Sequence, residues 1–169
     1  MNNFGLVVIG AHSGVWLSSL LEEYKDKNIL LVEPVPYNII LLKENATKYK
    51  NITIETSAIS EKNEIKKFYY VKHDAVKKLG KHWASGIGSF DKQHILNHKY
   101  KRFMVTDIDI EEIDVQYLTF SNLMEKYSVS SIDLLQIDVE GAEFQILNSI
   151  NFEKIEIKKI IFEFKHFDG

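Results

Sequence analysis

Blocks of apolar and polar positions alternate along the chain, and they predict strands and helices in turn. Short apolar runs rich in β-branched residues indicate buried strands, whereas apolar residues at i, i+3, i+4 and i+7 indicate helices. Strands are predicted at residues 5–10, 28–33, 51–59, 64–71, 103–108, 115–118, 132–138 and 157–164. Four helices are predicted. The first spans residues 17–24, the second starts at residue 36, the third ends at residue 127, and the fourth spans residues 143–150. This alternation implies βαβ units around a mainly parallel sheet, and therefore an α/β fold.

Residue types at the predicted helix ends refine these limits. Ser13 can cap the first helix, and Thr119 or Ser121 can cap the helix that reaches residue 127. Pro36 suits the first turn of the second helix. The apolar positions of that second helix are Ile39, Ile40 and Leu42.

Residues 74–101 interrupt the alternation. The segment is polar and contains His82, His94 and His98. We interpret it as an insertion or lid within a single domain spanning residues 1–169, because no repeat, low-complexity stretch or linker divides the chain.

The composition excludes several classes of function. The 169 residues are 45% hydrophobic, which fits a globular domain, and the net charge of −3 provides no basic field for nucleic acid. Arg102 is the only arginine, which disfavours bidentate arginine clamps on phosphate, and the absence of cysteine rules out disulfides and thiolate chemistry. No apolar run approaches the length of a membrane helix, and the first residues lack the features of a secretory signal. We expect a cytoplasmic protein that binds neither nucleic acid nor membrane.

A glycine-bearing turn, Gly10-Ala11-His12-Ser13-Gly14, separates the first predicted strand from the first predicted helix. Gly10 allows a tight turn, and Gly14 allows a ligand to approach the backbone where the helix begins. The turn is not a P-loop, because no Lys-Ser/Thr pair follows the second glycine. It also departs from G-x-G-x-x-G, because His12 replaces the middle glycine. A nucleoside cofactor without phosphates fits better, and the alternative is a purely structural turn.

Glu33 ends the second predicted strand, about 20 residues after the turn. An acid at this position can accept hydrogen bonds from both ribose hydroxyls of a nucleoside. The alternative is a solvated carboxylate at a strand end, but the spacing from the glycine turn favours ribose binding.

Three acids, Asp138, Glu140 and Glu143, follow the most apolar predicted strand. Ligands of open parallel sheets bind outside the carboxyl ends of the strands, so Asp138 should point into a cleft. Asp138 could orient a cofactor amine, act as a general base or bind a divalent cation. Glu140 and Glu143 could shape an acceptor pocket, although the helix dipole alone favours an acid at Glu143.

Histidines offer further candidates. His94 and His98 would share a helix face and could bind a metal, but no third ligand is evident and we predict no metal site. Glu163 and His166 come at the end of the last predicted strand, at the same sheet edge as Asp138. His166 is a candidate base near neutral pH, and the alternative is an exposed terminal side chain.

Five segments of the chain match the motifs of one enzyme family. The most specific is residues 132–143 (IDLLQIDVEGAE), which contains the block D-x-E-G-x-E. The others are residues 8–14, 32–34, 57–60 and 161–166, which read VIGAHSG, VEP, SAIS and IFEFKH. Together they resemble the FkbM family of S-adenosylmethionine-dependent methyltransferases, in the expected order and over nearly the whole chain.

The resemblance implies a Rossmann-like class I methyltransferase fold, with helices on both faces of a mainly parallel sheet. It also implies S-adenosyl-L-methionine as cofactor and methylation of a hydroxyl oxygen on a sugar or small metabolite. By position, residues 10–14 would face the methionine part of the cofactor and Glu33 would hold its ribose. Ser57 and Ala58 would border the adenine, and Asp138 would lie near the transferred methyl.

These observations lead us to predict an S-adenosylmethionine-dependent O-methyltransferase. Asp138 or His166 would remove a proton from the acceptor hydroxyl, and Glu140 and Glu163 would contact the acceptor. The acceptor, a saccharide or other small molecule, would enter beneath residues 74–101.

Three other functions remain open from the sequence, and a structural or scaffold role is the least favoured of them. The first is a degenerate methyltransferase-like binding domain that lost its cofactor through Val8 and His12, which stand where the family usually has Asp and Asn. The second is a nicotinamide-dependent oxidoreductase, which the missing middle glycine disfavours.

The last predicted strand, residues 157–164, raises a question about assembly. Methyltransferase folds of this kind generally add an antiparallel hairpin after it, and we expect that hairpin to be missing here. The strand would then form an unpaired edge. We expect either a partner chain to cover this edge, as in a homo-oligomer, or a shortened form of the fold.

Overall fold

The computed structural model describes residues 2–80, 82–97, 105–139 and 141–163. The chain divides into two compact units. Residues 1–64 and 116–169 form the first unit, and residues 65–115 form the second unit. Residues 74–101 belong to the second unit, and their role as a lid stays a prediction.

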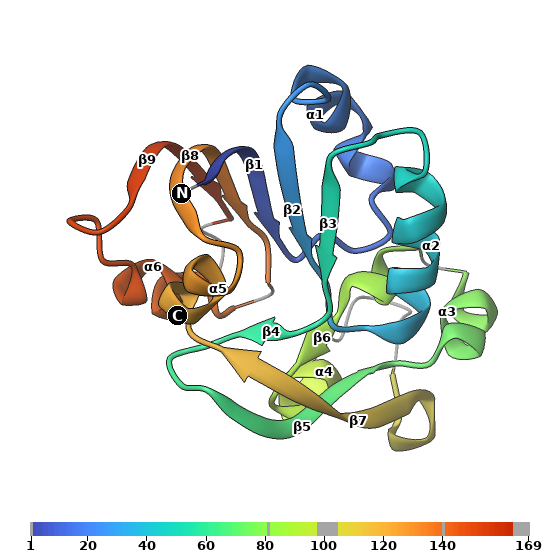
Figure 1. The fold of residues 1–169 in the computed structure, drawn as a ribbon. Helices are drawn as coiled ribbons and strands as arrows, with labels where there is room; N and C mark the ends of the chain where they lie inside the picture. The colour runs from blue at the N-terminus through green and yellow to red at the C-terminus, as the bar shows by residue number, and fades with distance from the viewer. Residues whose placement is uncertain (1, 81, 98–104, 140, 164–169) are drawn as a thin grey trace. The chain divides into compact units, whose positions relative to one another are not determined.

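A fully parallel sheet of five strands forms the centre of the first unit, in the order β3-β2-β1-β8-β9 (Figure 1). The strands are β1 (Asn2–Ile9), β2 (Asn28–Val32), β3 (Ile52–Glu55), β8 (Val129–Ile137) and β9 (Glu156–Phe162). Except for the first residues of each, β1 and β2 are buried, as expected for strands covered on both faces. The prediction of an α/β fold with a mainly parallel sheet is confirmed.

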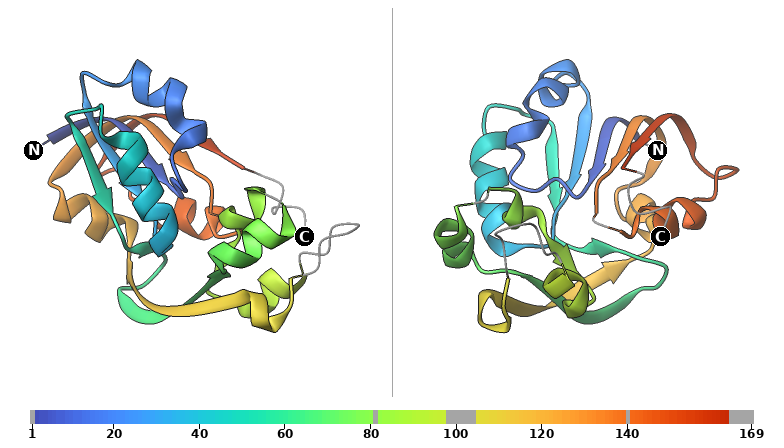
Figure 2. Two further views of the ribbon diagram at one scale, coloured as in Figure 1. Left: turned by 90° about the vertical axis from the view of Figure 1, so that its right-hand side faces the viewer. Right: turned by 180° about the vertical axis from the view of Figure 1, so that it is seen from behind.

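Helices cover both faces of this sheet (Figure 2). Because successive side chains of a strand point to opposite faces, β1 contributes to two apolar clusters. Val7 and Ile9 pack on the side of α5 and α6, whereas Leu6 and Val8 pack on the side of α1 and α2. The helices are η1 (Val15–Leu17), α1 (Ser18–Glu23), α2 (Pro36–Ala46), α5 (Phe120–Lys126) and α6 (Glu143–Ser149).

A second sheet has the order β4-β7-β5-β6. Its strands are β4 (Ala58–Ile59), β5 (Glu64–Val71), β6 (Gly88–Ser89) and β7 (Ile110–Leu118). The helices of the second unit are α3 (His73–Leu79), η2 (His82–Gly86), α4 (Lys92–Asn97) and η3 (Asp107–Asp109). Its apolar core is Val71, Ala75, Val76, Ala84, Ile87, Ile95, Val105 and Ile110.

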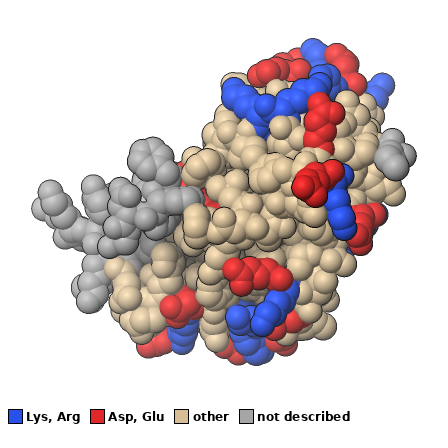
Figure 3. All heavy atoms as spheres, turned by 90° about the vertical axis from the view of Figure 1, so that its left-hand side faces the viewer, with Lys and Arg blue, Asp and Glu red and all other residues tan. Residues whose placement is uncertain are grey.

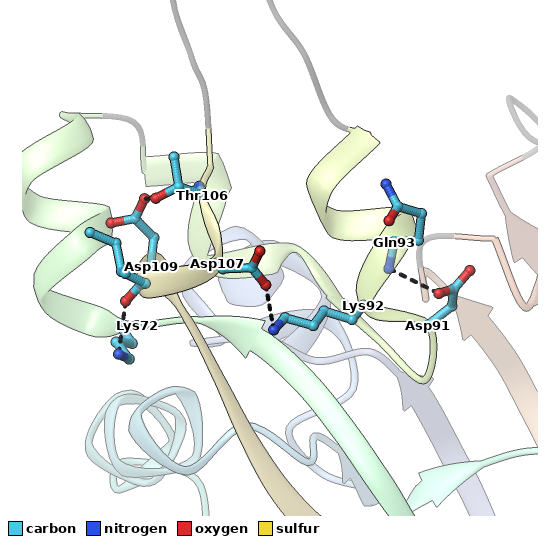
Figure 4. A network of polar contacts seen from close by, with 8 residues as sticks. Lys72, Asp91, Lys92, Gln93, Thr106, Asp107 and Asp109 are labelled. Carbon is cyan, nitrogen blue, oxygen red and sulfur yellow. Dashed lines mark hydrogen bonds and ion pairs between the residues drawn. The ribbon is translucent and has the colours of Figure 1, made fainter.

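Polar contacts hold the loops of the second unit together (Figure 4). Thr106 and Asp109 form a reciprocal capping box around η3, and Lys92 of α4 pairs with Asp107 at 2.5 Å between nitrogen and oxygen. The amide of Lys72 donates to the carbonyl of Asp109 at 2.8 Å. These contacts join three segments that are far apart in the sequence.

Two predicted strands are wrong in extent. Residues 51–59 do not form one strand, because the chain bends after Glu55 and β3 and β4 belong to different sheets. The bend follows from Glu55 itself, whose carboxylate accepts a hydrogen bond from the amide of Ser57 at 3.0 Å. Residues 105–108 are not a strand either, since Asp107–Asp109 is a 3-10 helix fixed by its capping box, and the next strand begins at Ile110. Residues 103 and 104 lie outside the described residues.

The helix caps and faces were predicted with mixed success. Thr119 caps α5, since its hydroxyl accepts from the amide of Asn122 at 3.1 Å. Ser13 does not cap the first helix, because Gly14 occupies the position before η1 and the Ser13 hydroxyl lies 3.2 Å from Nδ1 of His12. The buried positions of α2 are Asn38, Leu42 and Ala46, at intervals of four, whereas Ile40 is 58% exposed.

The strand β9 lies at one end of the sheet order among the described residues, and its side chains are mostly exposed. Its coverage by a partner chain stays a prediction. None of the described helices has the length and apolar composition needed to span a bilayer.

Candidate functional site

The parallel arrangement brings the loops that follow β1, β2, β3 and β8 to one edge of the sheet (Figure 1). The amide of Asp138 donates to the carbonyl of Ile9 at 2.9 Å, so the end of β8 lies against the end of β1. The amide of Glu33 donates to the carbonyl of Glu55 at 3.0 Å, which aligns the ends of β2 and β3. The structure therefore gathers the glycine turn, Glu33, Ser57 and Asp138 at the carboxyl edge, where open α/β sheets bind ligands.

The turn after β1 depends on glycine at both ends. Gly10 and Gly14 have φ values of +86° and +77°, in the left-handed region. A Cβ at Gly10 would lie 1.8 Å from the carbonyl oxygen of Asp138, and one at Gly14 would lie 2.6 Å from Cδ1 of Leu42 in α2. The turn is thus packed directly on the end of β8 and on α2. Ligand approach at Gly14 stays a prediction.

Most amides of this turn are already used within the protein. Gly10 and Ala11 donate to the carbonyl of Val32 at 3.0 and 2.9 Å, and Gly14 donates to the carbonyl of Ala11 at 3.1 Å. The amide of His12 donates to Oε2 of Glu33 at 2.9 Å. Phosphate-binding loops instead present free amides to the anion. The turn is therefore poorly suited to a pyrophosphate, which agrees with the prediction of a cofactor without phosphates at this position.

Glu33 is a buried acid that joins the first two loops. Its side chain is 5% exposed, and Oε2 accepts from His12 as described. Oε1 accepts from the amide of Val35 at 2.9 Å and from Nδ2 of Asn38 at 3.3 Å. Burial raises the pKa of Glu33 to about 7, although these hydrogen bonds lower it. A carboxylate has about four acceptor positions, so about one, on Oε2, is left for a ligand.

Glu55 is a second buried acid, at the end of β3. Its Oε1 accepts from the amide of Ser57 at 3.0 Å, and its Oε2 accepts from Nζ of Lys126 at 2.6 Å and from the hydroxyl of Tyr127 at 2.7 Å. Burial alone would raise the pKa of Glu55, but the hydrogen bonds from Lys126, Tyr127 and Ser57 outweigh it and hold the pKa below its usual value. Glu55 is therefore ionised at neutral pH.

Ser57 and Ala58 lie directly after this bend. Ser57 is 2% exposed, and its Oγ makes no hydrogen bond within the part of the chain that the structure describes. Ala58 is buried in β4, where it pairs with Tyr117 of β7. A buried hydroxyl without a partner costs about 1–3 kcal/mol, so the Ser57 hydroxyl is a place where a polar ligand atom would be favoured.

The loop after β8 is closed by a third buried acid. Glu143 is 1% exposed, and its carboxylate accepts from the amides of Val139 at 3.1 Å and Gly141 at 2.9 Å. Glu143 therefore shapes the turn that carries Asp138, whose own side chain is exposed. Glu140 lies outside the described residues.

One comparison with known proteins identifies this arrangement. The family model of the methyltransferase FkbM domain matches residues 9–169, nearly the whole chain. The chain belongs to the FkbM methyltransferase family. Neither the curated proteins nor the solved structures gave a match to it.

In this FkbM methyltransferase domain, the remaining predicted residues are distributed as follows. Glu163 comes directly after β9, and because Phe162 pairs with Ile137, Glu163 lies level with Asp138 at the carboxyl edge. His166 and His98 lie outside the described residues. Among the described residues no group of three or more His, Asp or Glu side chains could hold a metal ion.

Val8, one residue before the range that the family model matches, is fully buried in the apolar cluster with Leu6, Leu17 and Leu42. Its side chain therefore packs in the core between β1 and the helices α1 and α2.

On the face seen from the side of β9, acidic and basic side chains are interspersed (Figure 3). Two surface cavities lined by described residues lie away from the site loops, one beside α1 and one of about 400 Å³ between α5 and the start of β8.

Sequence reasoning missed Glu55, Lys126 and Tyr127, and it gave Glu143 no role in closing its own loop. A signal for Glu55 was present, because Glu33 and Glu55 each end a strand and each accept from the amide two residues further on. The contacts of Glu55 with Lys126 and Tyr127 span 71 and 72 residues of sequence and have no local signature.

Proposed function

We propose that this FkbM methyltransferase uses S-adenosyl-L-methionine to methylate a hydroxyl oxygen of a sugar or another small metabolite, within a Rossmann-like class I fold. Family membership supports methyl transfer. The choice of cofactor and reaction is supported by one observation. The glycine turn, most of whose amides are bonded within the protein, lies with the buried Glu33 and the exposed Asp138 at one edge of the sheet.

The described residues fit this cofactor. The turn at residues 10–14 would face its methionine part, where a bound phosphate would find few free amides. Glu33 would accept one ribose hydroxyl on the free position of Oε2, rather than both hydroxyls as the sequence suggested. Ser57 and Ala58 would border the adenine, and the Ser57 hydroxyl, which has no partner among the described residues, supports a polar contact there.

When bound, S-adenosylmethionine supplies a methyl group that its sulfonium already activates. The protein must then align the acceptor oxygen and remove its proton. We assign the removal of this proton to the carboxylate of Asp138. The Asp138 side chain is exposed, and its backbone amide donates to the carbonyl of Ile9, directly before the glycine turn. Glu163, which lies level with Asp138, would bind a hydroxyl of the acceptor. Glu140, two residues after Asp138 in the sequence, would also contact the acceptor. His166 is the second candidate base.

Calorimetry and a transfer assay test this proposal. The wild-type protein should bind S-adenosylmethionine and S-adenosylhomocysteine and should transfer labelled methyl groups to members of a panel of sugars and small hydroxyl compounds. Asp138→Asn should bind S-adenosylhomocysteine as the wild type does and lose turnover. Asp26→Asn, at an exposed position of the first unit, is the matched control and should change neither.

Three outcomes would contradict parts of the proposal. Absence of binding to both cofactor forms would favour a degenerate binding domain, and full turnover in Asp138→Asn would remove Asp138 from the chemistry. Stabilisation by NAD(H) in a thermal shift assay would favour an oxidoreductase, which the saturated amides of the turn disfavour.

A further inference from the structure

Glu55, Lys126 and Tyr127 form a polar cluster in the first unit that the proposed function does not use. We propose that it is a positioning device for the nucleoside end of the cofactor, acting on the ligand through Ser57. This inference rests on the proposed function, because it takes the adenine to lie beside Ser57.

The Glu55 carboxylate links the end of α5 to the bend after β3. Its two oxygens face different partners: Oε1 accepts from the Ser57 amide at 3.0 Å, and Oε2 accepts from Lys126 and Tyr127 at 2.6 and 2.7 Å. The bonds on Oε2 fix the rotation of the carboxylate, and this rotation fixes the direction in which Oε1 holds the Ser57 backbone. Lys126 and Tyr127 lie at the end of α5. Through the planar carboxylate of Glu55 they therefore influence the bend at Ser57.

The bend leaves one polar atom unsatisfied among the described residues. The Ser57 amide is bonded, but its Oγ has no partner among the described residues although the side chain is 2% exposed. Nearly all buried polar atoms in proteins have a partner. A buried hydroxyl that is held in place but has no hydrogen-bond partner among the described residues is expected where a ligand supplies that partner.

Lys126 and Tyr127 each direct a polar group at Glu55. Lys126 is half exposed and bonds Glu55, and the Tyr127 ring packs at the margin of the apolar cluster around α5 while its hydroxyl turns to Glu55. Because charge-assisted hydrogen bonds are short and strongly directional, the cluster controls the position of Ser57 more than it adds stability.

Binding measurements on variants test the inference. Adenosine and S-adenosylhomocysteine are titrated by calorimetry into the wild type, Glu55→Gln, Tyr127→Phe and Ser57→Ala. We expect Glu55→Gln and Ser57→Ala to weaken both ligands about tenfold, and Tyr127→Phe to weaken them several-fold. In turnover, Glu55→Gln should raise KM for S-adenosylmethionine and leave kcat near the wild-type value, because the reacting atoms are untouched.

Two matched controls separate positioning from stability. Lys158→Met removes an ion pair with Asp133 at 2.8 Å at the other end of the sheet, and Tyr49→Phe removes a buried hydroxyl that has no partner among the described residues. Both should leave the affinity for adenosine unchanged. Melting curves confirm that each variant is folded, and Tyr127→Phe serves if Glu55→Gln does not fold.

The results distinguish the positioning role of the cluster from the proposed function. If the wild type binds the ligands and folded Glu55→Gln and Tyr127→Phe bind them equally well, the positioning role is overturned and the proposed function stands. If the wild type binds neither adenosine nor S-adenosylhomocysteine, the proposed function falls and this inference falls with it.

Discussion

Glu33 makes the stability of the protein depend on pH in a direction opposite to that of most surface acids. Burial raises its pKa from 4.5 to about 7 in the folded state. Between these two pH values the native state therefore holds more protons than the unfolded state. The contribution of Glu33 to stability is fully present below pH 4.5 and is lost as the pH rises through about 7.

The magnitude follows from the size of the shift. A rise from 4.5 to about 7, at about 1.4 kcal/mol for each pKa unit, corresponds to about 3 kcal/mol. The side chain is almost wholly buried, so solvent screening does not reduce this figure substantially. Because a small domain is stable by only about 5–15 kcal/mol, the effect should be readily measured.

Urea denaturation followed by circular dichroism provides the assay, with the wild type and Glu33→Gln measured in parallel from pH 4.5 to about pH 8. The glutamine variant cannot titrate at this position, so its difference from the wild type isolates Glu33 from all other groups. We expect the wild type to lose about 3 kcal/mol relative to the variant across this range. A difference that stays constant with pH would refute the reasoning.

Three further changes probe the loops of the site and one helix cap. Gly10→Ala should destabilise the protein by about 3 kcal/mol or more in urea titrations, because the added Cβ would lie 1.8 Å from the Asp138 carbonyl; an unchanged midpoint would contradict the packing of the turn. Glu143→Ala should cost about 2–4 kcal/mol, since it leaves the buried turn amides without an acceptor, and Glu143→Gln should recover part of this loss. Thr119→Ala should lower stability by about 1 kcal/mol through loss of the α5 cap, whereas Thr119→Ser should be nearly neutral in thermal melts.

Much of the fold could be predicted from the sequence, because the central strands are continuous apolar runs. β1, β2, β8 and β9 lie close to their predicted positions, and their parallel order brings Glu33 and Asp138 together as expected. The prediction failed where polar side chains bend the chain locally. Glu55 breaks a β-branched run by binding the Ser57 amide, and the Thr106 capping box turns a strand-like sequence into a 3-10 helix.

The candidate site was predictable in its position and less so in its internal contacts. A carboxylate after a strand indicates the carboxyl edge, but the sequence does not say whether its oxygens face a ligand or the protein. Glu33 was expected to accept hydrogen bonds from both ribose hydroxyls, yet three protein donors already use most of its capacity. Lys126 and Tyr127 could not be found by pattern, since only the folded chain brings them to Glu55.

The bend after β3 and the turn after β8 are each fastened by an acid from the same short stretch: Glu55 holds Ser57, and Glu143 holds Gly141 and Val139. The bend after β3 also depends on Lys126 and Tyr127 of the α5 end, but neither fastening uses a residue of the other stretch, so the two stretches are modular. Mutation can remodel the residues around Asp138 without loosening the bend at Ser57, and the reverse also holds. Substitutions over evolutionary time could therefore change one stretch while the other is inherited intact.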